Sequence, residues 1–84
     1  MKPLTQYGRL AEGHWRQFRP RLTAQLEARG QLHALLLVAE ERTEVELDSL
    51  RRHFLQPGLT PQQAHDRAWE IVRERYIFLH PETE

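Results

Sequence analysis

Side chains that could bind a metal ion or act as nucleophiles are few and scattered in this sequence. The single serine, Ser49, lacks the flanking glycines of a nucleophile elbow, and the chain has no cysteine. The histidines form no HxxxH or HExxH pair, and no two of them lie within one helical turn of each other. They are His14, His33, His53, His65 and His80. We therefore expect no catalytic, metal-binding or cofactor-binding residue and no small-molecule substrate, and we interpret the chain as non-enzymatic.

A short acidic cluster, Glu40, Glu41 and Glu44, is the nearest approach to a carboxylate metal site. The Glu-x-x-His motif of di-iron helical bundles is absent, however. Isolated acidic clusters on helices are mostly solvated, and by themselves they contribute little to the stability of the fold. We therefore interpret these three glutamates as a solvated acidic face.

Positive charge is concentrated in "YGRLAEGHWRQFRPRL", residues 7–22, which holds Arg9, Arg16, Arg19 and Arg21. Such a cluster could contact the phosphates of a nucleic acid, so a nucleic-acid-binding regulator is one hypothesis. Glu12 lies between Arg9 and Arg16 and can pair with either of them at helical spacing. No recognition helix with polar side chains follows the turn. The other hypothesis is that these arginines are solvated, or paired within this chain or with a second copy.

The totals describe one small domain, residues 1–84, with twelve basic and twelve acidic side chains and 39% hydrophobic residues. A core this small is only marginally stabilising, so we expect the protein to form a homo-oligomer or to bind a protein partner. Residues 1–30 hold six basic and two acidic side chains, a net charge of +4, whereas residues 31–84 hold six and ten, a net charge of −4. No apolar run resembles a signal peptide or a membrane span, so we expect a cytoplasmic protein that does not enter the membrane.

The apolar residues recur with a helical period throughout, which predicts an all-α fold of four helices, two short and two longer, with no strands. The expected helices are residues 5–18, residues 20–29, a long helix of about 25 residues from Leu32, and a fourth that begins at Pro61 with Thr60 and Gln63 as a capping box. At Gly30 the second and third helices either break or only kink. The fourth helix presents Ala64, Ala68, Ile71, Val72 and Arg75 on one face, and Pro81 is expected to end the ordered chain.

The long third helix carries a seam with heptad spacing. Such a helix would be ~38 Å long, longer than the ~30 Å diameter of a compact chain of this size. Either the monomer is elongated or a partner covers the excess. We therefore expect self-association through the seam, at Leu36, Ala39, Thr43, Leu47 and Leu50.

Residues 7–32 and, more faintly, 68–79 resemble the TnpV family of small proteins encoded on bacterial transposons. The matching elements are Tyr7-Gly8-Arg9, Arg19-Pro20, Leu22, Leu26, Gly30 and Leu32 in the first segment, with Glu70, Ile71, Val72 and Tyr76-Ile77 in the second. The resemblance implies an accessory protein of a mobile genetic element and implies no catalytic residue or cofactor.

Overall fold

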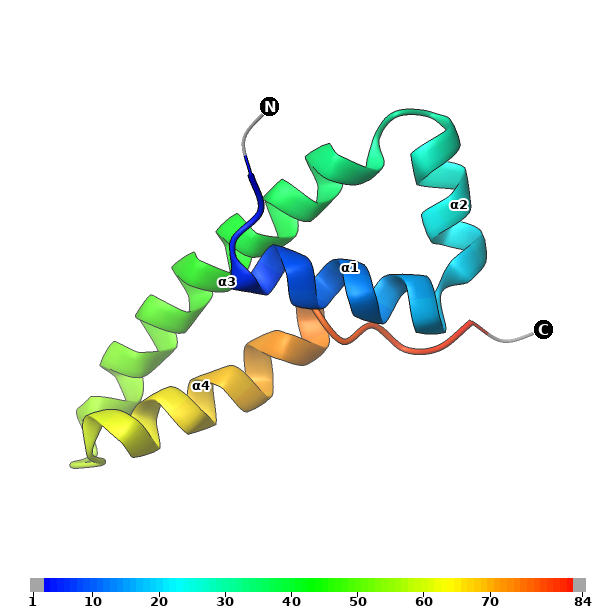
Figure 1. The fold of residues 1–84 in the computed structure, drawn as a ribbon. Coiled ribbons are helices and arrows are strands. Elements are labelled where there is room, and N and C mark those ends of the chain that lie inside the picture. Colours follow the sequence, from blue (N-terminus) through cyan, green and yellow to red (C-terminus); the bar gives the residue numbers. More distant parts are fainter. Residues whose placement is uncertain (1–2, 83–84) are drawn as a thin grey trace.

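Four α-helices joined by short connections make up the fold of the computed structural model, which describes residues 3–82 (Figure 1). They are α1 (Gln6–Phe18), α2 (Pro20–Ala28), α3 (Leu32–Leu55) and α4 (Pro61–Tyr76). Residues 3–82 contain no strand. The predicted all-α fold with two short and two longer helices is confirmed, and each observed boundary lies within one or two residues of the predicted one.

The boundary between α3 and α4 follows the predicted local chemistry. Thr60 Oγ1 accepts a hydrogen bond from the Gln63 amide at 3.2 Å, and Gln63 Oε1 accepts one from the Thr60 amide at 3.0 Å. Pro61 occupies the first helical position, where its missing N–H costs nothing. This reciprocal capping box needs only residues close in sequence, which is why the sequence predicts it.

The chain breaks at Gly30 and does not merely kink. Gly30 has φ +69°, and the Gln31 amide donates to the Leu26 carbonyl at 2.8 Å, which closes the end of α2. A left-handed residue ends a helix because the next N–H groups turn back onto its last carbonyls. As a result α2 and α3 point in clearly different directions (Figure 1).

Distant glutamates cap both N-terminal helices. Thr5 is the N-cap residue of α1, as predicted, but its side chain does not cap the helix. Instead, a Glu40 carboxylate oxygen on α3 accepts hydrogen bonds from the Thr5 amide at 2.7 Å and the Thr5 hydroxyl at 2.8 Å. Its negative charge also lies at the positive end of the α1 dipole. Glu40 is only 4% exposed, so the interpretation of Glu40 as part of a solvated acidic face is wrong.

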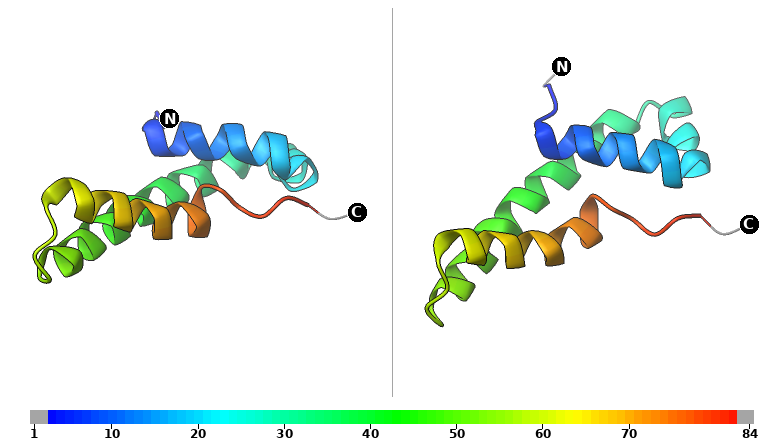
Figure 2. Two further views of the ribbon diagram at one scale, coloured as in Figure 1. Left: turned by 90° about the horizontal axis from the view of Figure 1, so that it is seen from below. Right: turned by 60° about the horizontal axis from the view of Figure 1, so that its bottom comes forward.

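Helices α3 and α4 form the main packed pair, and α1 lies across one side of it (Figure 2). The helix pair closes at the turn after α3 and opens toward the other end, where α2 lies (Figure 1). The principal extents are 47 × 33 × 14 Å and the radius of gyration is 14.4 Å. A compact chain of 84 residues would have a radius near ~12 Å. The monomer is therefore elongated, which is one of the two outcomes expected from the length of α3.

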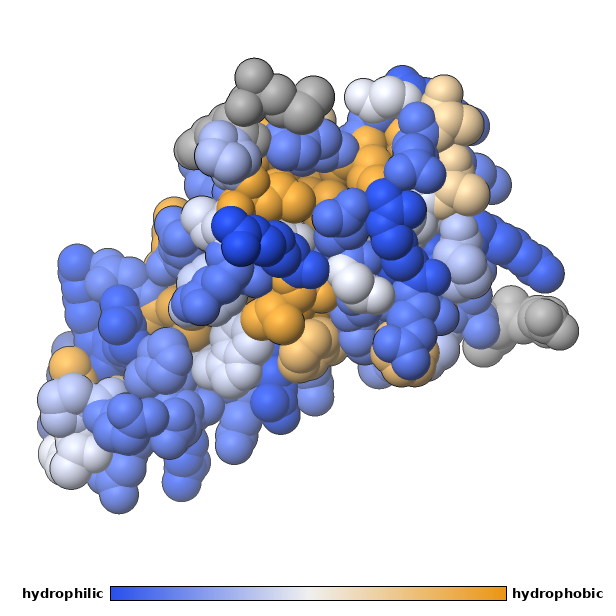
Figure 3. All heavy atoms as spheres, viewed as in Figure 1, coloured by the Kyte–Doolittle hydropathy of each residue, from blue (hydrophilic) through white to orange (hydrophobic). Residues whose placement is uncertain are grey.

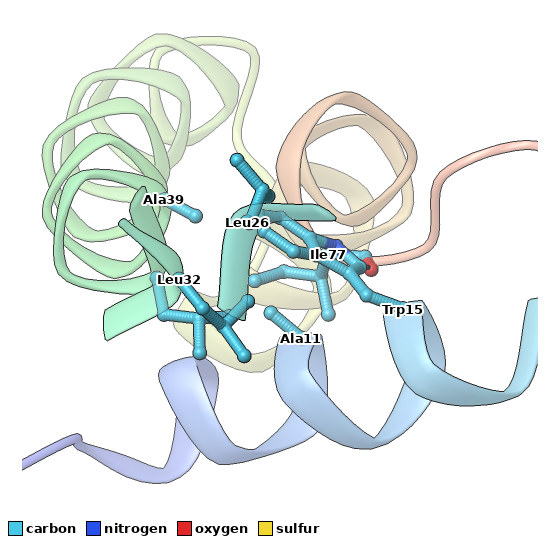
Figure 4. Packing of buried hydrophobic residues seen from close by; sticks show 7 residues of the cluster. Ala11, Trp15, Leu26, Leu32, Ala39 and Ile77 are labelled. Atoms are coloured by element: carbon cyan, nitrogen blue, oxygen red, sulfur yellow. Dashed lines mark hydrogen bonds between the residues drawn. The ribbon is translucent and has the colours of Figure 1, made fainter. Parts of the chain in front are cut away.

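The larger part of the core gathers side chains from all four helical regions of the chain (Figure 4). Trp15 of α1 packs among Leu26, Leu36 and Ile77, and its indole N–H donates to the Ile77 carbonyl at 3.2 Å. A second, smaller cluster joins α3 to α4 through Leu47, Ala68 and Val72. Both clusters are described in full by residues within 3–82.

The chain after α4 runs back alongside α1 toward α2 (Figure 1). His14 donates to the Leu79 carbonyl at 2.9 Å, and the Glu82 amide donates to the Phe18 carbonyl at 2.9 Å. The Glu82 carboxylate accepts from the amides of Arg21 at 3.3 Å and Leu22 at 2.9 Å, the second and third residues of α2. Glu82 therefore replaces the missing N-cap side chain of α2, and the expectation that order ends at Pro81 is wrong.

Replacing Glu82 with alanine is expected to lower the free energy of unfolding by about 1 kcal/mol, the usual cost of losing a helix N-cap. The measurement is equilibrium unfolding in urea. Glu74→Ala is the matched control, because Glu74 is an exposed glutamate of α4 that caps no helix, and its effect should stay within about 0.5 kcal/mol. Equal effects of the two substitutions would contradict the capping role of Glu82.

Candidate interaction surface

The predicted self-association seam lies inside the chain. Leu36, Ala39, Thr43 and Leu47 are at most 5% exposed, and Leu50 is half-buried. Their burial comes from contacts within one copy. The structure therefore corrects the prediction that these five residues form a surface for a second copy.

Small residues on the neighbouring helices explain why the seam is covered. Leu47 packs against Ala68 and Val72 of α4, while Leu36 and Ala39 pack in the cluster that contains Ala11 of α1. Alanine side chains allow helix axes to approach closely, so the large seam residues fill the space between the helices. The packing of α1 and α4 on α3 therefore decides that the apolar seam is internal.

A second row of side chains on α3 remains exposed. It consists of Leu35, Val38, Arg42 and Val45, spaced by steps of three, four and three residues, and is called the α3 strip below. Leu35 is 41% exposed, Val38 42% and Val45 63%. This row lies about 100° around the helix from the buried seam, since Leu35, Val38 and Arg42 each precede a seam position by one residue. Branched aliphatic side chains aligned on an open helix face are typical of an interaction surface.

Open hollows flank the α3 strip. One of about 400 Å³ is lined by Val38, Arg42, Val45, Glu46 and Tyr76, together with Glu41. Another of about 230 Å³ lies between Val38, Arg42 and Tyr76 and reaches Leu35. The two hollows share the middle of the strip, so side chains of a partner could enter on both sides of it.

The edge of the strip toward α4 is polar and is held by contacts within the chain. The Glu46 carboxylate accepts hydrogen bonds from the Tyr76 hydroxyl and the Arg75 guanidinium. The hydrogen bond to this carboxylate, followed by burial and the negative charge of Glu46, raises the pKa of Tyr76 above its ordinary value. Both carboxylate oxygens of Glu46 thus already accept hydrogen bonds from their own chain. These contacts hold the polar edge of the strip in place.

The arginines predicted as a basic cluster are divided by the fold. Arg16 donates to Glu12 at 2.9 Å and to Glu27 at 2.8 Å, and these bonds, that of Glu27 most of all, raise the pKa of Arg16 above its ordinary value. The same bond from Arg16 lowers the pKa of Glu27. The pair Glu12–Arg16 matches the helical spacing noted in the sequence.

Of the other three arginines, Arg19 and Arg21 line one hollow beside Glu82, and Arg19 is already held by contacts within the chain. Arg19 donates to the His80 carbonyl at 3.2 Å and lies 3.8 Å from the Glu82 carboxylate. Arg9 and Arg21 are exposed, on different helices, and make no ion pair within residues 3–82. Two separate arginines provide much less phosphate contact than the four-residue cluster that the sequence predicted.

A further hollow of about 300 Å³ lies between α1, α2 and α3, with Leu4, Leu32 and Leu36 in its lining. Glu12, Arg16 and Glu27 lie at the same hollow, where the Arg16 guanidinium binds both carboxylates. The face in Figure 3 shows apolar atoms of this region within a mainly hydrophilic surface. Each of these three charged side chains therefore already has an ion-pair partner in its own chain, in contrast to the charges at the middle of the α3 strip.

Potential metal ligands do not gather in the described part of the chain. Among residues 3–82, no three histidine, aspartate or glutamate side chains are placed to hold one ion. No helix within those residues is both long enough and apolar enough to cross a membrane.

The α3 strip is therefore the surface whose residue types and exposure best fit a function. The sequence contained a signal for it, since Leu35, Val38, Arg42 and Val45 follow their own heptad spacing, one helical position away from the stronger seam. Compared with known proteins, the chain matches no family model, no curated protein and no solved structure.

Proposed function

We propose that this protein is a non-enzymatic interaction protein that self-associates through the α3 strip. The observation that carries the proposal is the alignment of Leu35, Val38 and Val45 on one open face, each more than two-fifths exposed. Single exposed apolar residues are normal on proteins, but an aligned row on a long helix fits a helix of a partner. This proposal keeps the third helix as the associating element and changes the residues that make the contact.

The size of the strip sets the expected strength of association. Completing the burial of a half-exposed leucine or valine contributes about 1 kcal/mol, and two copies provide three such side chains each. This gain from apolar burial is modest beside the cost of bringing two copies together. We therefore expect a weak complex, populated only at high micromolar to millimolar protein concentration.

Replacing Val45 with glutamate is expected to weaken self-association at least about tenfold, because it places a charge in the buried part of the contact. Val45 is 63% exposed in the monomer, so the fold should be unaffected. The measurement is sedimentation equilibrium at high micromolar to millimolar concentration, with circular dichroism to verify folding. Leu55→Glu is the matched control, since Leu55 is a 42% exposed apolar residue of the same helix outside the strip.

Two results would contradict the proposal. One is a wild-type protein that stays monomeric at millimolar concentration. The other is an equal loss of association with Val45→Glu and with Leu55→Glu, which would show that no particular face of α3 makes the contact.

A nucleic-acid regulator is the alternative function, and the arrangement of the arginines favours it less. Arg16 and Arg19 already donate to groups of their own chain, which leaves Arg9 and Arg21 on separate helices. Since affinity for nucleic acid rises with the number of phosphates contacted, two separate arginines support only weak, salt-sensitive binding.

The biological setting that we propose is an accessory role on a bacterial mobile element, in the cytoplasm. It rests on the resemblance of residues 7–32 and 68–79 to the TnpV family. Several residues of that resemblance have structural roles here: Gly8 lies against Glu40, Pro20 begins α2, and Gly30 ends the α2 turn. The test is the identity of the neighbouring genes, where transposase or recombinase genes would support the setting and their consistent absence would contradict it.

A further inference from the structure

We infer that the two copies pair antiparallel across their α3 strips, so that Arg42 of each copy lies beside the partner's Glu41. This inference rests on the proposed self-association and adds the orientation of the partner and the residues that select it.

Glu41 and Arg42 are available for such a contact. Both side chains are exposed at the middle of α3, and neither makes an ion pair within residues 3–82. Arg42 lies near the Tyr76 hydroxyl, which positions its guanidinium at the centre of the strip. Two other carboxylates of α3 already have partners, since Glu46 binds Arg75 and Asp48 binds Arg52 at 2.8 Å.

A parallel pair of α3 helices would place like charges together. Arg42 would face the partner's Arg42, and Glu41 would lie beside the partner's Glu46, because residues five apart on adjacent edges of a parallel pair are neighbours. Like charges in a contact disfavour that arrangement. Glu46 is bound to Arg75 and Tyr76 of its own chain and so is not free to neutralise Arg42 of another copy.

An antiparallel pair satisfies the charges and brings Val38 of each copy against the partner's Val45. When the two helices run in opposite directions and cross near residues 41 and 42, the Val38 end of one strip meets the Val45 end of the other. Arg42 of one copy then reaches the partner's Glu41, and two-fold symmetry makes the same ion pair twice. The aliphatic residues on either side of these pairs exclude water from them, which strengthens the attraction between the charges.

Cysteine cross-linking can measure the orientation, because the natural chain contains no cysteine. Val38→Cys and Val45→Cys are prepared as separate proteins, one of them carrying a mass tag, and are oxidised alone and as an equal mixture. Antiparallel pairing predicts rapid cross-linking only in the mixture. In that arrangement two copies of residue 38 lie about 10 Å apart along the helices, beyond the reach of a disulfide. Leu55→Cys is the control for random collisions.

Charge exchange tests the residues that select this orientation. Arg42→Glu and Glu41→Arg should each raise the dissociation constant about tenfold or more, since each places like charges together twice. The double variant with both substitutions restores opposite charges and should return the constant to within about threefold of the wild type.

The outcomes separate the orientation from the proposed function. Cross-linking of Val38→Cys alone or Val45→Cys alone, or a double variant as weak as the single ones, overturns the antiparallel pairing while self-association through the strip stands. A wild-type protein that stays monomeric overturns both. Cross-linking confined to the mixture, together with restoration by the double variant, supports the inference.

Discussion

Replacing Gly8 with alanine is expected to destabilise the protein by about 2 kcal/mol, although alanine is the better helix former. A Cβ atom at Gly8 would lie 2.4 Å from Glu40 Oε2 and 2.9 Å from a Leu4 methyl carbon. Glu40 would have to move, and its hydrogen bonds to Thr5 at the start of α1 would be lost. The overlap and the lost bonds outweigh the helix-propensity gain of about 1 kcal/mol.

Gly13 provides a matched control in the same helix. A Cβ atom at Gly13 would meet no atom within 4 Å, and the residue is exposed. Gly13→Ala is therefore expected to stabilise the protein by about 0.5–1 kcal/mol, through helix propensity alone. Urea unfolding of both variants measures the difference, and a stabilising Gly8→Ala would show that Glu40 does not hold its position against α1.

Replacing Ile77 with alanine is expected to cost about 3 kcal/mol, within the range for fully buried isoleucines. Ile77 is completely buried beyond the end of α4 and packs with Trp15, Leu26 and Leu36. Removing its side chain would leave a cavity beneath the indole of Trp15. Thermal or urea unfolding measures the loss of stability.

Ile71 is the control, because it is the isoleucine that the helical pattern places on the apolar face of α4. It is 36% exposed, so Ile71→Ala is expected to cost less than about 1 kcal/mol. If the two substitutions had equal effects, the packing of the segment after α4 against α1 would be wrong.

The two isoleucines show why the core could be predicted only in part. The periodicity of α4 identified Ala64, Ala68 and Val72, all of which are completely buried. Ile77 follows the last residue of α4, where the helical period no longer applies, and it is buried because the chain there turns back under α1. Periodicity indicates which face of a helix is apolar but says nothing of residues in irregular segments.

The α3 strip could not be separated from the seam by sequence alone. Both rows on α3 have heptad spacing, and they differ by about 100° around the same helix. Which row is covered depends on where α1 and α4 lie. The residue types in the turns that join the helices do not indicate the positions of these two helices. The seam predicted for self-association is buried within the chain, and the row that stays exposed on α3 is a different one.

The polar and charged contacts also divide into local ones, which the sequence predicts, and distant ones, which it does not. Glu12–Arg16 and the Thr60–Gln63 capping box join residues three or four apart, and both could be predicted. Glu40 caps α1 from 35 residues away, and Glu82 caps α2 from about 60 residues away. The residues next to Glu40 and Glu82 in the sequence do not indicate which helices these glutamates cap.

By itself, the sequence determined the four helices and most of their ends, because these depend on interactions between residues within one or two turns of each other. It left open whether the chain breaks or only kinks at Gly30, and the structure shows a break there. Only the tertiary structure decided that Leu36, Ala39, Thr43 and Leu47 are internal, that Glu40 and Glu82 act as caps, and that Leu35, Val38 and Val45 remain open. The physical reason is that burial and capping by distant residues depend on the directions in which whole helices pack, which local spacing does not specify.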